Sequence, residues 1–177
     1  MPAGIAEEDR TRRNRVVKEK VLNQATHIRD ELTQIERITA NVESDWSGFE
    51  RTGDDAYLKA AAYDLHGYYT GLERVFQSVA DTIDDNLPSG ENWHKDLLLQ
   101  MTKEIVGIRP ALLSEETATV LEEYLKFRHR VRNIYSFNLI PERVEGLVER
   151  LPRIHEQVRL NLEDFTEFLE NLSRTIR

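Results

Sequence analysis

Apolar residues recur three and four positions apart along most of this 177-residue chain. Residues at that spacing fall on one face of an α-helix, because each helical turn takes 3.6 residues. The chain has only eight glycines and five prolines, so few residues interrupt the pattern. No segment alternates apolar and polar residues as a half-buried strand does. The sequence therefore predicts an all-α fold.

Turn-forming residues divide the pattern into about five helices. These helices are expected over residues 7–41, 55–86, 92–106, 115–135 and 141–172, with a loop over 44–54. Ser114 is expected to cap the fourth helix, and Pro152 is expected to kink or split the fifth. Long helices with short links predict an antiparallel bundle. The length predicts one domain over residues 1–177, and residues 1–15 are expected to form a flexible tail.

Composition restricts the classes of function. The net charge is -8, which argues against extensive nonspecific coating of nucleic acid, since such binding relies on neutralising phosphates. The absence of cysteine excludes disulfides and thiolate metal sites and favours a reducing, cytoplasmic compartment. The charged N-terminal residues do not resemble a signal peptide, and no window has the roughly 18 consecutive apolar residues of a membrane span.

A basic cluster interrupts this acidic chain. The seven residues 126–132 contain no acid and four basic residues, Lys126, Arg128, Arg130 and Arg132. At about 100° per residue, Arg128 and Arg132 share one side of a helix with Tyr135. Guanidinium groups bind phosphate oxygens in a bidentate fork, so the cluster predicts a phosphate-binding surface. The alternative is a solvated basic face that pairs with acids from another helix.

The segment FRHRVRNIYSFNLIPERVEGLVERLP, residues 127–152, resembles the HepT-like branch of the HEPN superfamily. The signature of that branch is an arginine, four residues, a histidine, one residue and a tyrosine. Arg128 and Tyr135 match the arginine and the tyrosine, His129 fills a polar position after the arginine, and Asn133 stands in place of the histidine. The segments DLHGYYTGLERVF, LPSGENWHKDLLLQM and IRPALLSEET resemble the branch in the same order.

The resemblance implies a ribonuclease toxin of a toxin–antitoxin pair that needs no metal and no cofactor. Arg128 would hold the scissile phosphate, and Arg130 and Arg132 would contact other RNA phosphates. The resemblance also implies a homodimer in which the two motif helices face each other. A nucleotidyltransferase antitoxin would attach adenylate to Tyr135, which would place a phosphate group beside the arginines.

Asn133 leaves the chemistry of this predicted site open. An amide cannot act as a general acid or base near neutral pH. Three alternatives follow: His129 carries the proton, the phosphate clamp alone gives weak cleavage, or the chain is a noncatalytic dimer that binds nucleotide or the nucleotidyltransferase. Arg128 and Asn133 are about 140° apart on a regular helix, so a joint site requires a distorted helix or a second subunit.

Other polar residues give weaker signals. Glu91 and His94 have the Glu-x-x-His spacing of di-iron bundles, but a second copy is missing, so Trp93 and His94 are expected to pack at a helix start. Isolated histidines such as His27 and His155 are expected to be structural. A structural bundle that assembles with other helices remains a third hypothesis, since the first helix is long and amphipathic.

Overall fold

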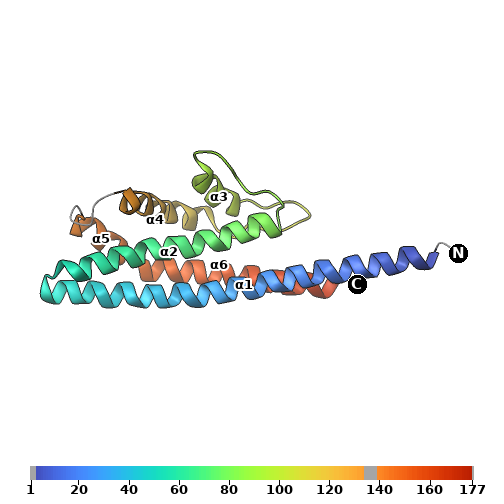
Figure 1. Cartoon of the computed structure of the whole chain (residues 1–177), viewed down its shortest axis with the longest axis horizontal. Coiled ribbons are helices and arrows are strands. Elements are labelled where there is room, and N and C mark those ends of the chain that lie inside the picture. The colour runs from blue at the N-terminus through green and yellow to red at the C-terminus, as the bar shows by residue number, and fades with distance from the viewer. Residues whose placement is uncertain (1–2, 134–138, 177) are drawn as a thin grey trace.

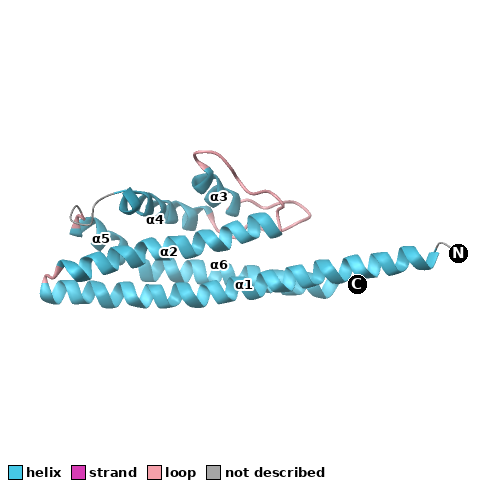
Figure 2. Cartoon of the chain, in the orientation of Figure 1, coloured by secondary structure: helices cyan, strands magenta, loops and turns pink. Residues whose placement is uncertain are grey.

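The computed structural model describes residues 3–133 and 139–176, with side chains described for residues 7–131 and 139–176. It contains six helices within those ranges and no strand (Figure 2). The helices are α1 (Ala3–Thr52), α2 (Asp55–Thr82), α3 (Trp93–Met101), α4 (Glu115–Asn133), α5 (Pro141–Val148) and α6 (Leu151–Thr175). The predicted all-α bundle is confirmed.

Helix α2 occupies the middle of the bundle (Figure 1). The long helices α1 and α6 pack together on one side of it, and the shorter helices α3, α4 and α5 lie on the other. The N-terminal part of α1 extends beyond the remaining helices. None of the described helices is long and apolar enough to cross a bilayer.

The core follows from the position of α2. Its large side chains Tyr68, Tyr69, Leu72 and Phe76 are completely inaccessible to solvent, because neighbours cover the helix on both sides. Burying each large apolar side chain stabilises the fold by about 1.5–3 kcal/mol. The layer of α3, α4 and α5 therefore packs against a central helix whose large side chains are fully buried.

The loop predicted over residues 44–54 is wrong, because α1 continues to Thr52. Trp46 and Phe49 pack on the core with ring centroids 5.3 Å apart, which extends the apolar face beyond the expected helix end at residue 41. Gly48 lets α1 approach α2 closely, since a Cβ there would lie 2.5 Å from Cδ1 of Tyr57. Gly53, with φ of +66°, ends the helix in the left-handed conformation that glycine tolerates.

Other boundaries also differ from the prediction, and α2 ends at Thr82 instead of residue 86. The expected fifth helix is divided into α5 and α6, and Pro152 lies in the first turn of α6. Proline is tolerated there because a backbone N–H in the first turn has no intrahelical acceptor to lose. Helix α3 ends at Met101 instead of residue 106, because the following segment turns back and pairs Ile105 with Arg109. The predicted Ser114 cap is confirmed: the Thr117 amide donates to its Oγ over 3.0 Å.

Candidate functional site

Three helices bring polar side chains together on the α3–α4 side of α2. Glu73 comes from α2, His94 from the start of α3, and Arg128 and His129 from the last turns of α4. We call these four residues the Glu73 cluster. Glu73 lies between the core residues Leu72 and Val75, so the packing of α2 places its carboxylate inside the protein.

Glu73 joins the other members of the cluster. Nη2 of Arg128 lies 2.9 Å from Oε1 of Glu73, and Nδ1 of His94 lies 2.5 Å from Oε2. Nε of Arg128 also donates to Oγ1 of Thr70 over 3.2 Å. Glu73 is 4% exposed and Arg128 is 9% exposed. Each carboxylate oxygen of Glu73 thus has a partner, and the two charges compensate each other away from water.

Aromatic rings surround the histidines of the cluster. The imidazole of His94 stacks on Trp93 with ring centroids 3.6 Å apart, and it meets the ring of His129 edge-on at 5.0 Å. The Tyr69 hydroxyl is buried nearby and has no hydrogen-bond partner among the described residues. Burial, with the negative charge of Glu73, raises the pKa of Tyr69 well above its usual value. Tyr69 therefore remains a neutral phenol at physiological pH.

One donor of the Arg128 guanidinium remains unused. Its Nη1 is buried and has no hydrogen-bond partner in the part of the chain that the structure describes. A buried donor without an acceptor costs about 1–3 kcal/mol, more for a charged group. The cluster thus combines a fixed cation, a spare donor and two imidazoles, which are the groups needed to stabilise a phosphate and transfer protons.

The predicted site residues are only partly brought together. Arg128 points inward and pairs with an acid from another helix, but it is buried, whereas the structural alternative expects a solvated face. His129 lies beside His94. Helix α4 is α-helical through Asn133, so helix distortion does not bring Arg128 and Asn133 onto one face. The side chains of Arg132 and Asn133, and all of Tyr135, lie outside the described residues.

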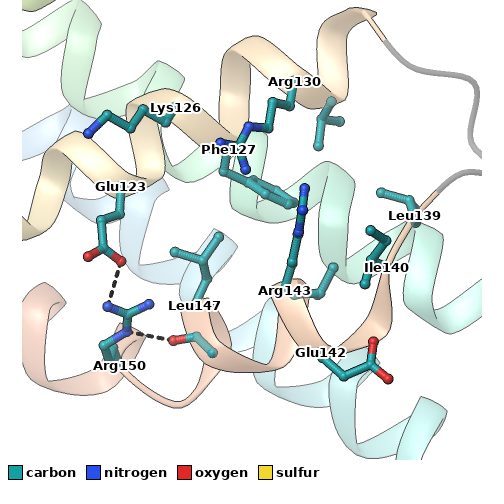
Figure 3. A pocket seen from close by; sticks show the side chains of 13 residues that line it. Glu123, Lys126, Phe127, Arg130, Leu139, Ile140, Glu142, Arg143, Leu147 and Arg150 are labelled. Carbon is teal, nitrogen blue, oxygen red and sulfur yellow. Dashed lines mark hydrogen bonds and ion pairs between the residues drawn. The ribbon is translucent and has the colours of Figure 1, made fainter.

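Arg130 faces a different space from Arg128. It lines a pocket of about 380 Å³ between α4 and α5, together with Arg143 and Arg150 and the apolar side chains of Phe127, Val131, Leu139, Ile140, Val144 and Leu147. Figure 3 shows Arg130 reaching from α4 and Arg143 reaching from α5 toward this pocket, which Glu123 and Glu142 also line.

The cations of this pocket differ in their partners. Arg150 pairs with Glu123, Nη1 to Oε2 over 2.5 Å, and Lys126 pairs with Glu122 over 3.1 Å. Arg130 and Arg143 are exposed, and neither forms an ion pair with another described residue. Four basic side chains and two acidic ones line the pocket, so its charge favours an anion there.

Sequence reasoning missed Glu73 and His94. Glu73 had a usable signal, since it is a lone acid among apolar residues on the inner face of a helix, where an unpaired charge is costly. For His94, the only pattern in the sequence was the Glu-x-x-His spacing with Glu91, which is typical of a metal site. Among the described residues, no group of three or more histidines, aspartates and glutamates could hold a metal ion. His94 pairs with Glu73 of another helix.

Comparison with known proteins adds one finding. No curated protein and no solved structure matches the chain. The family model described as HepT-like protein matches residues 60–169, which is more than half of the chain and includes all four residues of the Glu73 cluster. On this match, the chain belongs to the HepT-like protein family.

Proposed function

We propose that this protein is an RNA-cleaving toxin that acts in the cytoplasm without a metal ion. The observation that carries the proposal is the Glu73 cluster, which places a fixed arginine beside two histidines within the family-matched segment. Phosphodiester cleavage by the neighbouring 2′-hydroxyl needs stabilisation of charge on the phosphate and transfer of protons. The cluster contains groups for both tasks.

Arg128 is suited to the phosphate. Its guanidinium is held by Glu73 and Thr70, so it needs little reorganisation when negative charge develops. Its Nη1, which is buried and has no hydrogen-bond partner among the described residues, would donate to an oxygen of the phosphate once RNA enters the cluster. His129, next to Arg128 in sequence, is the motif residue that we assign to proton transfer. Asn133 would hydrogen-bond the phosphate or the ribose, because its amide cannot transfer protons.

The pocket between α4 and α5 is suited to bind RNA beside this site. Arg130 and Arg143 would contact backbone phosphates, and the apolar side chains of Phe127 and Ile140 would contact a base or ribose. We assign Arg132 to the same role by its position in the motif. The strongly negative net charge limits basic binding surfaces to such local sites.

We further propose a homodimer and a nucleotidyltransferase antitoxin that adenylylates Tyr135. A second copy would bring another set of motif arginines to the site, as the family resemblance implies. The mass of the chain co-expressed with a neighbouring nucleotidyltransferase gene tests the modification. One or more adenylate increments, lost in Tyr135→Phe, are expected. An unchanged mass would count against this form of neutralisation.

The cleavage test uses purified full-length protein, total tRNA and EDTA. Cleavage is expected, and Arg128→Lys should lower its rate by about 10²-fold or more, because lysine lacks the second donor arm of the guanidinium. Lysine keeps the charge opposite Glu73, so folding is retained better than in Arg128→Ala. Arg37→Ala on the exposed face of α1 is the matched control. Undiminished cleavage by both Arg128 variants would reject the assignment.

A noncatalytic HepT-like dimer is the second candidate. Two observations favour it: Asn133 replaces the motif histidine, and Arg128 is already occupied by Glu73. Expression of the chain alone would then cause neither growth arrest nor RNA cleavage. In that case Asn133→His becomes informative, since gained cleavage would show a site that lacks only a proton carrier.

A further inference from the structure

We propose that His94 on α3 performs the proton transfer that Asn133 cannot, with Glu73 as its positioning residue. This inference rests on the proposed ribonuclease function and names a residue outside the matched motif. The motif around Arg128 assigns His94 no role, because His94 precedes Arg128 by 34 positions. The folding of α3 against α2 and α4 brings it to the site.

The Glu73 carboxylate orients the His94 ring. Oε2 of Glu73 faces Nδ1 of His94 at 2.5 Å, so Nδ1 carries the hydrogen and Nε2 is left as the proton acceptor. Stacking on Trp93 fixes the plane of the ring. The His94 side chain is 13% exposed, which leaves it reachable at an otherwise buried site. A fixed tautomer, a fixed plane and partial access are what a general base requires.

Neutralising Glu73 does not require His94. Arg128 already compensates the buried carboxylate, with Nη2 2.9 Å from Oε1. The second oxygen is therefore available to position an imidazole. The same carboxylate thus links the group that would hold the phosphate to the group that would move the proton. His94 contacts Glu73 of α2 and His129 of α4, and Arg128 of α4 reaches it through Glu73.

His94 and His129 supply two imidazoles, which suffices for the full reaction. One imidazole accepts the proton of the 2′-hydroxyl while the bond from O2′ to phosphorus forms. The bond from phosphorus to O5′ breaks, and the other imidazole, protonated, gives its proton to O5′. The products are a 2′,3′-cyclic phosphate and a 5′-hydroxyl end. The step needs no water, metal or oxidant, and the two histidines exchange protonation states.

The test compares His94→Gln with wild type in EDTA, with a short single-stranded RNA as substrate. Glutamine can still donate to Glu73 but cannot transfer a proton, so the rate should fall by about 10²-fold or more at unchanged thermal stability. His27→Gln, on α1, is the matched control. Imidazole added to His94→Ala should restore part of the rate, which it would not do if His94 only packed the core.

Glu73→Gln tests the positioning role. Replacing the carboxylate by an amide should lower kcat with little change in KM, because Nδ1 of His94 would lose the carboxylate that orients the ring. Full activity of His94→Gln, with wild type active, would overturn this inference and leave the proposed function intact. Loss of rate without imidazole rescue would also overturn it. Failure of the wild type to cleave would reject the proposed function and, with it, this inference.

Discussion

Single residues of this protein show how close packing limits substitution. Gly71 on α2 faces Ile35 of α1, which is completely buried. Gly67, one turn earlier, faces Ile38 with more room. Both glycines lie inside the same helix, where alanine would otherwise be favoured. Substituting each glycine by alanine therefore separates the two effects: helix propensity changes equally at both positions, whereas packing differs between them.

We expect Gly71→Ala to destabilise the fold by about 1–3 kcal/mol, because a Cβ there would lie 2.8 Å from Cγ1 of Ile35 and the core would have to move. Gly67→Ala is the control. Its Cβ would lie 3.7 Å from Cδ1 of Ile38, and the substitution should be neutral or stabilise by about 0.5–1 kcal/mol. Urea unfolding measures both. Equal effects at the two positions would contradict the packing argument.

His155 on α6 makes stability depend on pH. Its ring meets Tyr68 edge-on, and burial lowers the pKa of His155 below its usual value, a shift that Glu36 opposes. A lowered pKa in the folded state means that protonation favours unfolding. The contribution of His155 is therefore complete above about pH 6.5 and is lost as the pH falls toward the lower pKa of the folded state.

In wild type, the free energy of unfolding should decrease as the pH falls from about 7.5 to 5.5, a range in which most carboxylates do not yet titrate. In His155→Gln this decrease should be smaller. Urea midpoints across that range measure the slope, and His27→Gln on α1 serves as the control. The same slope in wild type and His155→Gln would show that His155 does not titrate with folding.

At the scale of elements, sequence patterns predicted helix cores better than helix ends. The apolar spacing identified every long helix, because burial of one face is a local property of the sequence. The ends depend on single contacts instead. Ser and Gly near residues 44–54 resembled a loop, yet Trp46 and Phe49 reached the core and Gly48 made room for Tyr57. The cap at Ser114 is local and was predictable.

Ser114→Ala should destabilise the protein by about 1 kcal/mol, because the Thr117 amide at the start of α4 loses its acceptor. Ser114→Asp is the matched control, since aspartate also accepts at this position. Thermal unfolding measures the difference. If Ser114→Asp were as unstable as Ser114→Ala, the cap would not be the cause. The start of α4 matters because this helix carries Arg128.

For the whole molecule, one buried ion pair ties the connections on either side of α3 together. Arg109 contacts Asp84 with both Nε, over 2.5 Å, and Nη2, over 2.7 Å, and neither side chain is exposed. Arg109 also donates to the carbonyl oxygens of Lys103, Pro110 and Gln100. This network joins the end of α2 to the segment between α3 and α4, and so fixes the layer that carries His94.

Arg109→Met should destabilise the fold by about 3–5 kcal/mol, because Asp84 would be left buried without its partner. Arg159→Met is the matched control. Arg159 pairs with Glu156 and Glu163 on the solvent-facing side of α6, where such pairs contribute at most about 1 kcal/mol. Denaturant unfolding distinguishes them. A small effect of Arg109→Met would show that water or another group compensates Asp84.

The helical class, the approximate helices and the family resemblance around Arg128 follow from the amino-acid sequence, since periodicity and motif spacing are local. Three features depend on how the chain folds: Arg128 points inward to Glu73, Arg130 faces a separate pocket, and His94 joins the cluster. The physical reason is that these contacts join α2, α3 and α4. Which side chains meet there depends on how the helices pack, and no spacing within one helix encodes it.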